Sequence, residues 1–201
     1  MESLALISRL KWIGWGFLIF LVLLLAFNFQ YFAIQLGYFY RYDLLGQDLG
    51  HAEPNGKPDR IVINRIGVDA PLIYPDVGDE SAIQLALEAG VAHYPGTAQV
   101  GQSGNAYFLG HSSESPSDPG QFKTVFALLT QLREGDKILI TDSRGRQFSY
   151  QIFDRAVVSP GQTNVLDPIL GHPRMLSLQT SYPLGTTLWR YIVRAELVTN
   201  K

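Results

Sequence analysis

Three polar residues of the chain have side chains suited to nucleophilic catalysis. His111 follows the apolar stretch 105–110, Ser181 ends a run of alternating residues, and Arg190 begins the next such run. A serine hydroxyl becomes a useful nucleophile when a neutral histidine takes its proton, and a guanidinium stabilises the negative charge that then develops. On spacing alone, a structural role is as well supported as a catalytic one for the histidine. For a serine at a strand end and a charged residue on an outer face, the structural role is the better supported.

Residues 175–195 predict two neighbouring strands joined by a tight turn. In both halves of this segment apolar side chains recur at every second position, as expected for half-buried strands. Pro183 and Gly185, between the two halves, favour a turn. Ser181 closes the first strand and Arg190 opens the second, so these two residues are expected to lie side by side.

This segment resembles the signature of the sortase family. In that signature a strand ending in Thr-Leu-x-Thr-Cys is followed by a loop and by a strand that opens with a functional arginine. Residues 177–180 read Ser-Leu-Gln-Thr, and Arg190 stands at the arginine position. Ser181 stands where the family has its nucleophilic cysteine. Upstream, Gly110 and His111 match the Gly-His segment that carries the catalytic histidine of sortases.

The resemblance covers residues 60–197 and implies a mostly all-β fold, a closed sortase-like β-barrel with short helices. It implies a transpeptidase or hydrolase that cuts a C-terminal sorting motif similar to Leu-Pro-x-Thr-Gly in a surface protein. The acyl group would pass to an amine, such as a peptidoglycan precursor or a pilin lysine. The residues it assigns are the catalytic His111, Ser181 and Arg190, and the substrate-binding Ser112, Thr180 and Tyr182.

The serine in place of cysteine changes what the mechanism requires. A thiol with a pKa of about 8.5 is partly ionised near neutral pH, whereas a serine hydroxyl must lose its proton during attack. His111 would then be neutral and hydrogen-bonded to Ser181, as in a serine hydrolase. Candidate carboxylates that could orient the histidine are Glu114, Asp118 and Asp142.

Several interpretations of this serine stay open. One is an active enzyme that uses Ser181, and another is an inactive homologue that binds sorting-signal peptides without cleaving them. A third is a Cys-to-Ser variant of a cysteine enzyme. A membrane-anchored β domain without any peptide site is the remaining alternative.

The N-terminal part of the chain is predicted to contain a transmembrane helix. No residue from Trp12 to Tyr40 is charged, and a bilayer core of about 30 Å requires roughly 20 apolar residues in a helix. Arg9 and Lys11 precede this run, which favours a cytoplasmic N-terminus and a single-pass plasma-membrane protein with an extracytoplasmic domain. Residues 12–30 are assigned to the membrane contact. A cleaved signal peptide and a buried soluble helix are the alternatives.

Three parts of the chain are therefore expected: an N-terminus and anchor over residues 1–40, a Gly- and Pro-containing linker over 41–59, and a sortase-like domain over 60–201. Composition argues against several other classes. The net charge is −2, so nucleic-acid binding is not expected. Cysteine is absent, so disulfides and thiolate metal sites are not expected. No histidines and carboxylates have metal-ligand spacing, so neither a metal nor another cofactor is predicted. His93 is expected to be structural, and His51 and His172 to be solvated.

Overall fold

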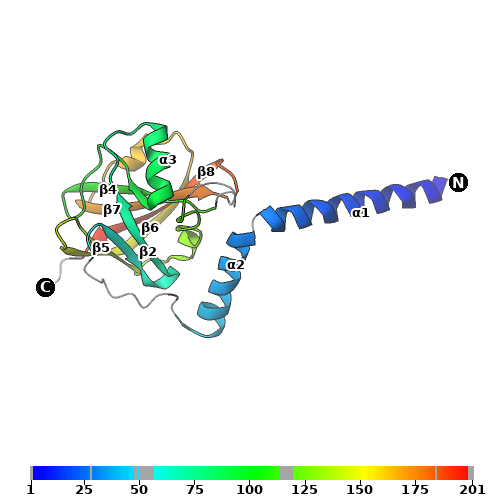
Figure 1. Cartoon of the computed structure of the whole chain (residues 1–201), viewed down its shortest axis with the longest axis horizontal. Helices are drawn as coiled ribbons and strands as arrows, with labels where there is room; N and C mark the ends of the chain where they lie inside the picture. Colours follow the sequence, from blue (N-terminus) through cyan, green and yellow to red (C-terminus); the bar gives the residue numbers. More distant parts are fainter. Residues whose placement is uncertain are drawn as a thin grey trace.

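The computed structural model describes residues 2–27, 29–47, 49, 57–113, 120–183 and 185–198. In this part of the chain eight strands form a closed barrel in the order β1-β2-β3-β4-β7-β8-β6-β5 (Figure 1). The predicted closed β-barrel with short helices is confirmed. The strands are β1 (Arg60–Ile63), β2 (Val68–Ile73), β3 (Val91–His93), β4 (Gly104–Leu109), β5 (Lys137–Thr141), β6 (Gln147–Val158), β7 (Arg174–Tyr182) and β8 (Trp189–Leu197).

The pairing of β4, β7 and β8 decides where the candidate residues lie. Strands β4 and β7 are parallel, with Leu109 opposite Gln179, so both end at the same rim of the barrel. Strand β8 runs antiparallel to β7 and begins at that rim, with Ser181 opposite Arg190. Because His111 comes two residues after β4, the three candidate residues are delivered to one rim.

Alternation along β7 separates the barrel core from a polar outer face. Leu176 and Leu178 point into the core, and both are fully buried there. Thr180 continues the inner face, whereas Gln179 and Ser181 belong to the outer face because successive side chains of a strand point to opposite sides. The nucleophile candidate therefore lies outside the barrel core.

The outer face of these strands is covered by α3 (Glu80–Ala89) and by the connection between β6 and β7. Helix α3 begins where the Asp79 carboxylate accepts a hydrogen bond from the Ala82 N–H at 2.8 Å, an ordinary N-cap. Its apolar face packs Ile83 and Leu87 against Ala92 of β3. The remaining short helices of this domain are η2 (Asn64–Ile66), η3 (Leu129–Gln131) and η4 (Thr163–Leu166).

Two helices and a short π-helix precede the barrel: α1 (Glu2–Phe27), α2 (Phe29–Tyr38) and η1 (Phe39–Leu44). Figure 1 shows α1 extending away from the barrel. Among the described residues, no helix is both long and apolar enough to cross a bilayer, so the predicted transmembrane helix is not found. The uncharged run is divided between α1 and α2.

Helix α2 packs on the barrel domain. Ile34 and Tyr38 contact the main core, and Tyr38 is almost fully buried. The side-chain amide of Gln35 donates to the Ala127 carbonyl at 2.9 Å and accepts from Gln131 at 3.3 Å. The second half of the uncharged run therefore contributes Ile34 and Tyr38 to the core of the folded domain.

Candidate active site

A cavity of about 320 Å³ lies on the outer face of β4, β7 and β8, at the rim where β4 and β7 end. His111, Ser181 and Arg190 all line it, as does Thr180. One wall comes from α3 and another from the β6–β7 connection, which are distant from the motif in the sequence. The convergence of the three predicted catalytic residues is therefore a property of this structure, whereas their roles stay a prediction.

Hydroxyl groups tie the histidine segment to the end of β7. The Thr180 hydroxyl donates to the Gly110 carbonyl at 2.7 Å, and the Ser112 hydroxyl donates to the Ser181 carbonyl at 3.1 Å. Both side chains are buried. The Gly110 N–H also donates to the Gln179 carbonyl at 3.0 Å. These three bonds flank His111 and hold its backbone against the strand that carries Ser181.

The predicted substrate-binding residues differ in position. Thr180 lines the cavity, but its hydroxyl proton is directed to a backbone carbonyl. Ser112 lies beside the cavity lining rather than in it. Tyr182 is 37% exposed, and its ring centroid lies 5.9 Å from that of Tyr191. In this structure Ser112 and Thr180 fix the site, and Tyr182 lies on the surface next to it.

Arg190 is anchored through one nitrogen of its guanidinium. Its Nη1 donates to the carbonyls of Thr187 and Trp189 at 3.0 and 3.1 Å. A guanidinium has five N–H donors, so three remain on Nε and Nη2, and these bond to no described residue. Side chains directly opposite in an antiparallel pair share a face, with Cβ atoms about 5 Å apart. Arg190 is thus placed to present donors beside Ser181.

Glycine is required before His111 because the ring of Phe126 occupies the space of a side chain. A Cβ built on Gly110 would collide with that ring. Phe126 is 1% exposed, and its N–H donates to the His111 carbonyl at 2.8 Å. The Gly-His pair thus has a local physical cause: the phenylalanine packs on the glycine and hydrogen-bonds to the histidine backbone.

The substitution Gly110→Ala is expected to lower the stability of the domain by about 1–3 kcal/mol, the usual cost of forcing a methyl group into a packed core. The thermal midpoint measured by circular dichroism should fall by several degrees. Gly161→Ala is the matched control, since a Cβ at that position meets no atom within 4 Å. Equal midpoints for the two variants would contradict the packing argument.

The structure adds cavity residues that the sequence did not indicate. The Tyr107 hydroxyl donates to Oε1 of Gln179 at 2.6 Å, and both residues line the cavity. Burial raises the pKa of Tyr107, so the hydroxyl stays protonated and can donate. The bond fixes the amide with its Nε2 as the remaining donor. On α3, Gln84 donates to Glu80 at 2.7 Å along another wall. No motif signals these contacts, because packing alone creates them.

His93 supports the structural role predicted for it. The side chain is buried, and its Nε2 lies 2.9 Å from the Ala98 carbonyl and 3.1 Å from the Thr97 hydroxyl. Burial lowers the pKa of His93 and so favours the neutral ring. Its ring also packs against Tyr74 and Phe108.

The prediction that His172 is solvated is wrong. Its Nδ1 lies 2.6 Å from a carboxylate oxygen of Glu196, and its ring stacks on Phe153 with centroids 3.7 Å apart. The loop before β7 is therefore attached to the barrel by this histidine, a long-range contact that the local Pro-containing sequence did not reveal.

Asp142 cannot orient His111 as predicted. It follows β5 at the rim opposite the candidate site, where its carboxylate pairs with Arg146 at 2.7 Å. The other proposed carboxylates, Glu114 and Asp118, lie outside the described residues, as does His51. Within the described ranges no group of three or more histidine, cysteine or acidic residues has the geometry to hold a metal ion.

Comparison with known proteins identifies the family. A model described as "Sortase domain" matches residues 61–198. The chain therefore belongs to the sortase family. No curated protein sequence matches it significantly.

Solved structures of sortases resemble the fold. A Clostridium perfringens sortase D5 transpeptidase is 28% identical with a TM-score of 0.56, over 70% of this chain and 78% of that one. Sortase C-1 from Actinomyces oris is 28% identical with a TM-score of 0.56, over 70% and 71%. Sortase A from Corynebacterium diphtheriae is 26% identical with a TM-score of 0.57, over 71% and 60%.

Proposed function

We propose that the protein is a transpeptidase that cleaves a C-terminal sorting-motif peptide similar to Leu-Pro-x-Thr-Gly and transfers the acyl group to an amine, with Ser181 as nucleophile. The observation that carries this proposal is the single cavity lined by His111, Ser181 and Arg190 at one rim of a sortase-family barrel. The acceptor amine would belong to a peptidoglycan precursor or to a pilin lysine.

The proposed reaction proceeds through an ester of Ser181. Its Oγ attacks the carbonyl carbon of the Thr–Gly bond while His111 takes the hydroxyl proton. Arg190 stabilises the oxyanion, the C–N bond breaks, and His111 returns the proton to the leaving amine. An incoming amine then attacks the ester carbonyl with His111 as base. Transfer of the acyl group restores the Ser181 hydroxyl.

A second candidate function is peptide binding without cleavage. The observation that favours it is the serine itself, because its hydroxyl is a far weaker acid than the thiol of the family's cysteine. In that case the cavity beside Arg190 would hold a sorting-signal peptide as a binding site only.

One assay distinguishes the transpeptidase from the peptide-binding protein. The full chain is incubated with a Leu-Pro-x-Thr-Gly peptide and an excess of an amine, and the products are separated by mass spectrometry. The transpeptidase predicts a peptide–amine adduct that is lost in Ser181→Ala and kept in Ser143→Ala, a serine at the opposite rim. Binding without any product supports the second function. Neither binding nor product would contradict both.

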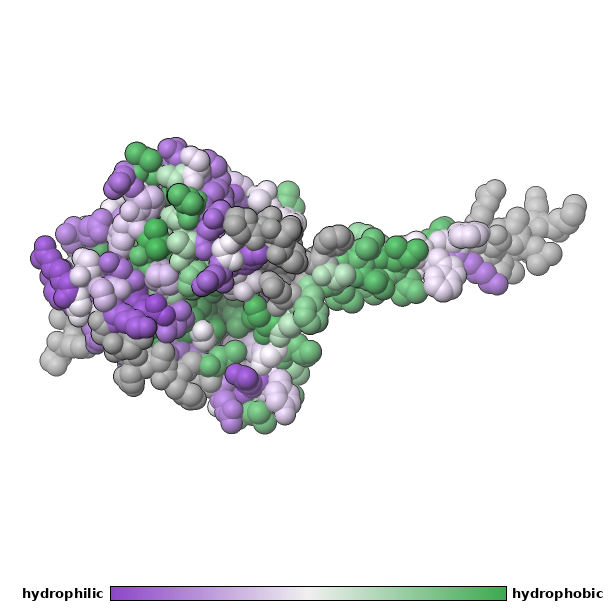
Figure 2. Space-filling view, viewed as in Figure 1, coloured by the Kyte–Doolittle hydropathy of each residue, from purple (hydrophilic) through white to green (hydrophobic). Residues whose placement is uncertain are grey.

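Membrane attachment is a further proposal. It is supported by the uncharged run after Arg9 and Lys11 and by the exposed apolar side chains of α1 over residues 12–26, which form the hydrophobic surface of this helix in Figure 2. Such a helix is unfavourable in water because its apolar area has no protein partner. We propose that this apolar surface holds the domain at the outer side of the plasma membrane.

Protease added to cells from which the wall has been removed is therefore expected to digest the barrel domain. An immunoblot with antibodies against the domain and against a cytoplasmic protein gives the readout, and the cytoplasmic protein must remain intact. Protection of the domain until the cells are lysed would contradict its location outside the membrane. Recovery in the soluble fraction after lysis would contradict the attachment.

A further inference from the structure

A second cavity, of about 510 Å³, lies at the other end of the barrel from the candidate active site. It is formed by the connection 99–102 before β4, the turn 142–146 between β5 and β6, and Asp59 before β1. Strands β4 and β6 begin at this rim, whereas β4 ends at the rim of His111. The two cavities are therefore separated by the length of the barrel. Its volume is typical of small-molecule sites, which span roughly 300–1,000 Å³.

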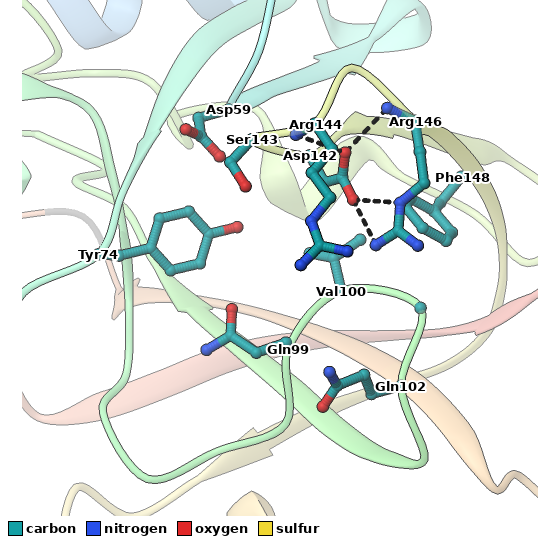
Figure 3. A pocket seen from close by; sticks show the side chains of 11 residues that line it. Asp59, Tyr74, Gln99, Val100, Gln102, Asp142, Ser143, Arg144, Arg146 and Phe148 are labelled. Carbon is teal, nitrogen blue, oxygen red and sulfur yellow. Dashed lines mark hydrogen bonds and ion pairs between the residues drawn. The ribbon is translucent and has the colours of Figure 1, made fainter.

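The turn that forms one wall is held by an internal network. The Asp142 carboxylate accepts from the backbone N–H groups of Arg144 and Arg146 at 3.0 and 2.8 Å, and from Nε of Arg146 at 2.8 Å (Figure 3). These bonds and the Arg146 charge lower the pKa of Asp142 despite its burial. The pair is satisfied within the turn, so neither partner is left to require a ligand.

The facing wall is fixed by a glycine and two aromatic rings. The N–H of Gly101 donates to the Tyr150 hydroxyl at 2.8 Å. Gly101 has a φ of +79°, and a Cβ there would collide with the ring of Phe148. The close approach and the left-handed backbone both require glycine. A third ring, Tyr74, packs on His93 with centroids 5.1 Å apart, which holds its hydroxyl at the cavity.

Several polar groups at this cavity have no protein partner among the described residues, and Arg144, Gln99 and Gln102 are exposed to solvent. The guanidinium of Arg144, the carboxylate of Asp59 and the hydroxyl of Tyr74 make no hydrogen bond or ion pair with any described residue. The same holds for the side-chain amides of Gln99 and Gln102. Figure 3 shows Arg144, Tyr74 and Gln99 pointing into one space. A positive and a negative side chain thus line the cavity without an ion-pair partner in the part of the chain that the structure describes.

The surroundings of the Asp59 carboxylate favour a cationic partner. Burial and the nearby Asp142 raise the pKa of the Asp59 carboxyl, so these surroundings disfavour its charged form. An ammonium group beside it would supply the missing stabilisation.

We propose that this cavity binds a small zwitterion, from amino-acid to dipeptide size, whose carboxylate pairs with Arg144 and whose ammonium pairs with Asp59. Arginine suits the carboxylate because its planar fork of donors matches two oxygens. Tyr74, Gln99 and Gln102 supply hydrogen bonds to the polar groups between the two ends. This site is separate from the transpeptidase reaction proposed above and does not depend on it.

Isothermal titration calorimetry of the full chain with diglycine tests the proposal. The matched probes are N-acetyl-diglycine, which keeps only the carboxylate, and diglycine amide, which keeps only the ammonium. Diglycine should bind, and each matched probe should bind about tenfold or more weakly, since a lost charge-assisted pair changes the dissociation constant by at least that factor.

Substitutions in the cavity test whether diglycine binds there. Arg144→Gln and Asp59→Asn should each weaken diglycine binding about tenfold or more. Arg133→Gln, at an exposed arginine elsewhere, and Ser181→Ala, at the opposite rim, should leave binding unchanged. Thermal midpoints of all variants confirm that they are folded. The proposal is overturned if diglycine does not bind at millimolar concentration, if a single-charge probe binds equally well, or if Arg144→Gln and Asp59→Asn bind like the unmodified protein.

Discussion

Replacing Ser181 with cysteine is expected to raise the turnover of a sorting-motif peptide about tenfold or more, because a thiol is partly ionised near neutral pH and a serine hydroxyl is not. The two side chains differ in a single atom, a sulfur in place of the oxygen. The cavity and the hydrogen bonds around it should therefore persist. Ser181 lies on the outer face of β7, directly opposite Arg190 in the strand ladder. A thiolate there gains from the neighbouring positive charge, which lowers the pKa of a cysteine.

The measurement is the rate of cleavage by both forms across a range of pH, with His111→Ala in each background as the control. If the native serine is inert, the cysteine form should produce cleavage where none existed. A cysteine form that is no faster, together with His111-dependent cleavage by the serine form, would contradict the prediction and establish a serine enzyme. Loss of the gain in the His111→Ala background would assign the activation to that histidine.

The second large effect is expected from Arg190→Lys, which should lower kcat by a factor on the order of 10² to 10³, as removal of an oxyanion donor does in other acyl-transfer enzymes. Arg190 uses Nη1 to bond the Thr187 and Trp189 carbonyls and keeps the donors of Nε and Nη2 for the cavity. A lysine ammonium is a single point of charge and cannot serve both positions. The positive charge of the lysine alone should therefore not restore kcat.

Arg194→Lys is the matched control for this experiment. Arg194 follows four residues later on the same strand face and forms an ion pair with Asp154. Its replacement should change kcat little, since it does not line the cavity. The steady-state kcat and KM of both variants are compared in whichever background, serine or cysteine, gives measurable turnover. Equal losses in the two variants would show that Arg190 acts only through general charge or stability.

Local patterns in the sequence predict some features of the barrel and its motif. The period-two alternation through 175–195 predicts the two strands and their turn, because only one face of each strand meets the core. Ser181 and Arg190 become cross-strand neighbours for the same local reason. Gly110 and His111 were recognisable as a pair, and the structure explains the glycine through the ring of Phe126.

The position of His111 relative to Ser181 depends on long-range strand pairing. Two hydrogen bonds join the histidine segment to the end of β7: Thr180 to Gly110, and Ser112 to Ser181. The two segments are about seventy residues apart in the sequence. That approach follows from the parallel pairing of β4 with β7, a contact that no local pattern encodes. The register then sets which side chains share the outer face.

Long-range packing also decided the residues that sequence patterns misplaced or missed. Asp142 belongs to the opposite rim because β5 runs toward it, and His172 binds Glu196 across the loop before β7. The Tyr107–Gln179 bond exists because β4 and β7 are paired. The cavity at the opposite rim is lined by Asp59 and by the turn 142–146, which are far apart in the chain. Alternation and turn chemistry act over a few residues, whereas strand pairing and barrel closure fix distances between segments far apart in the chain.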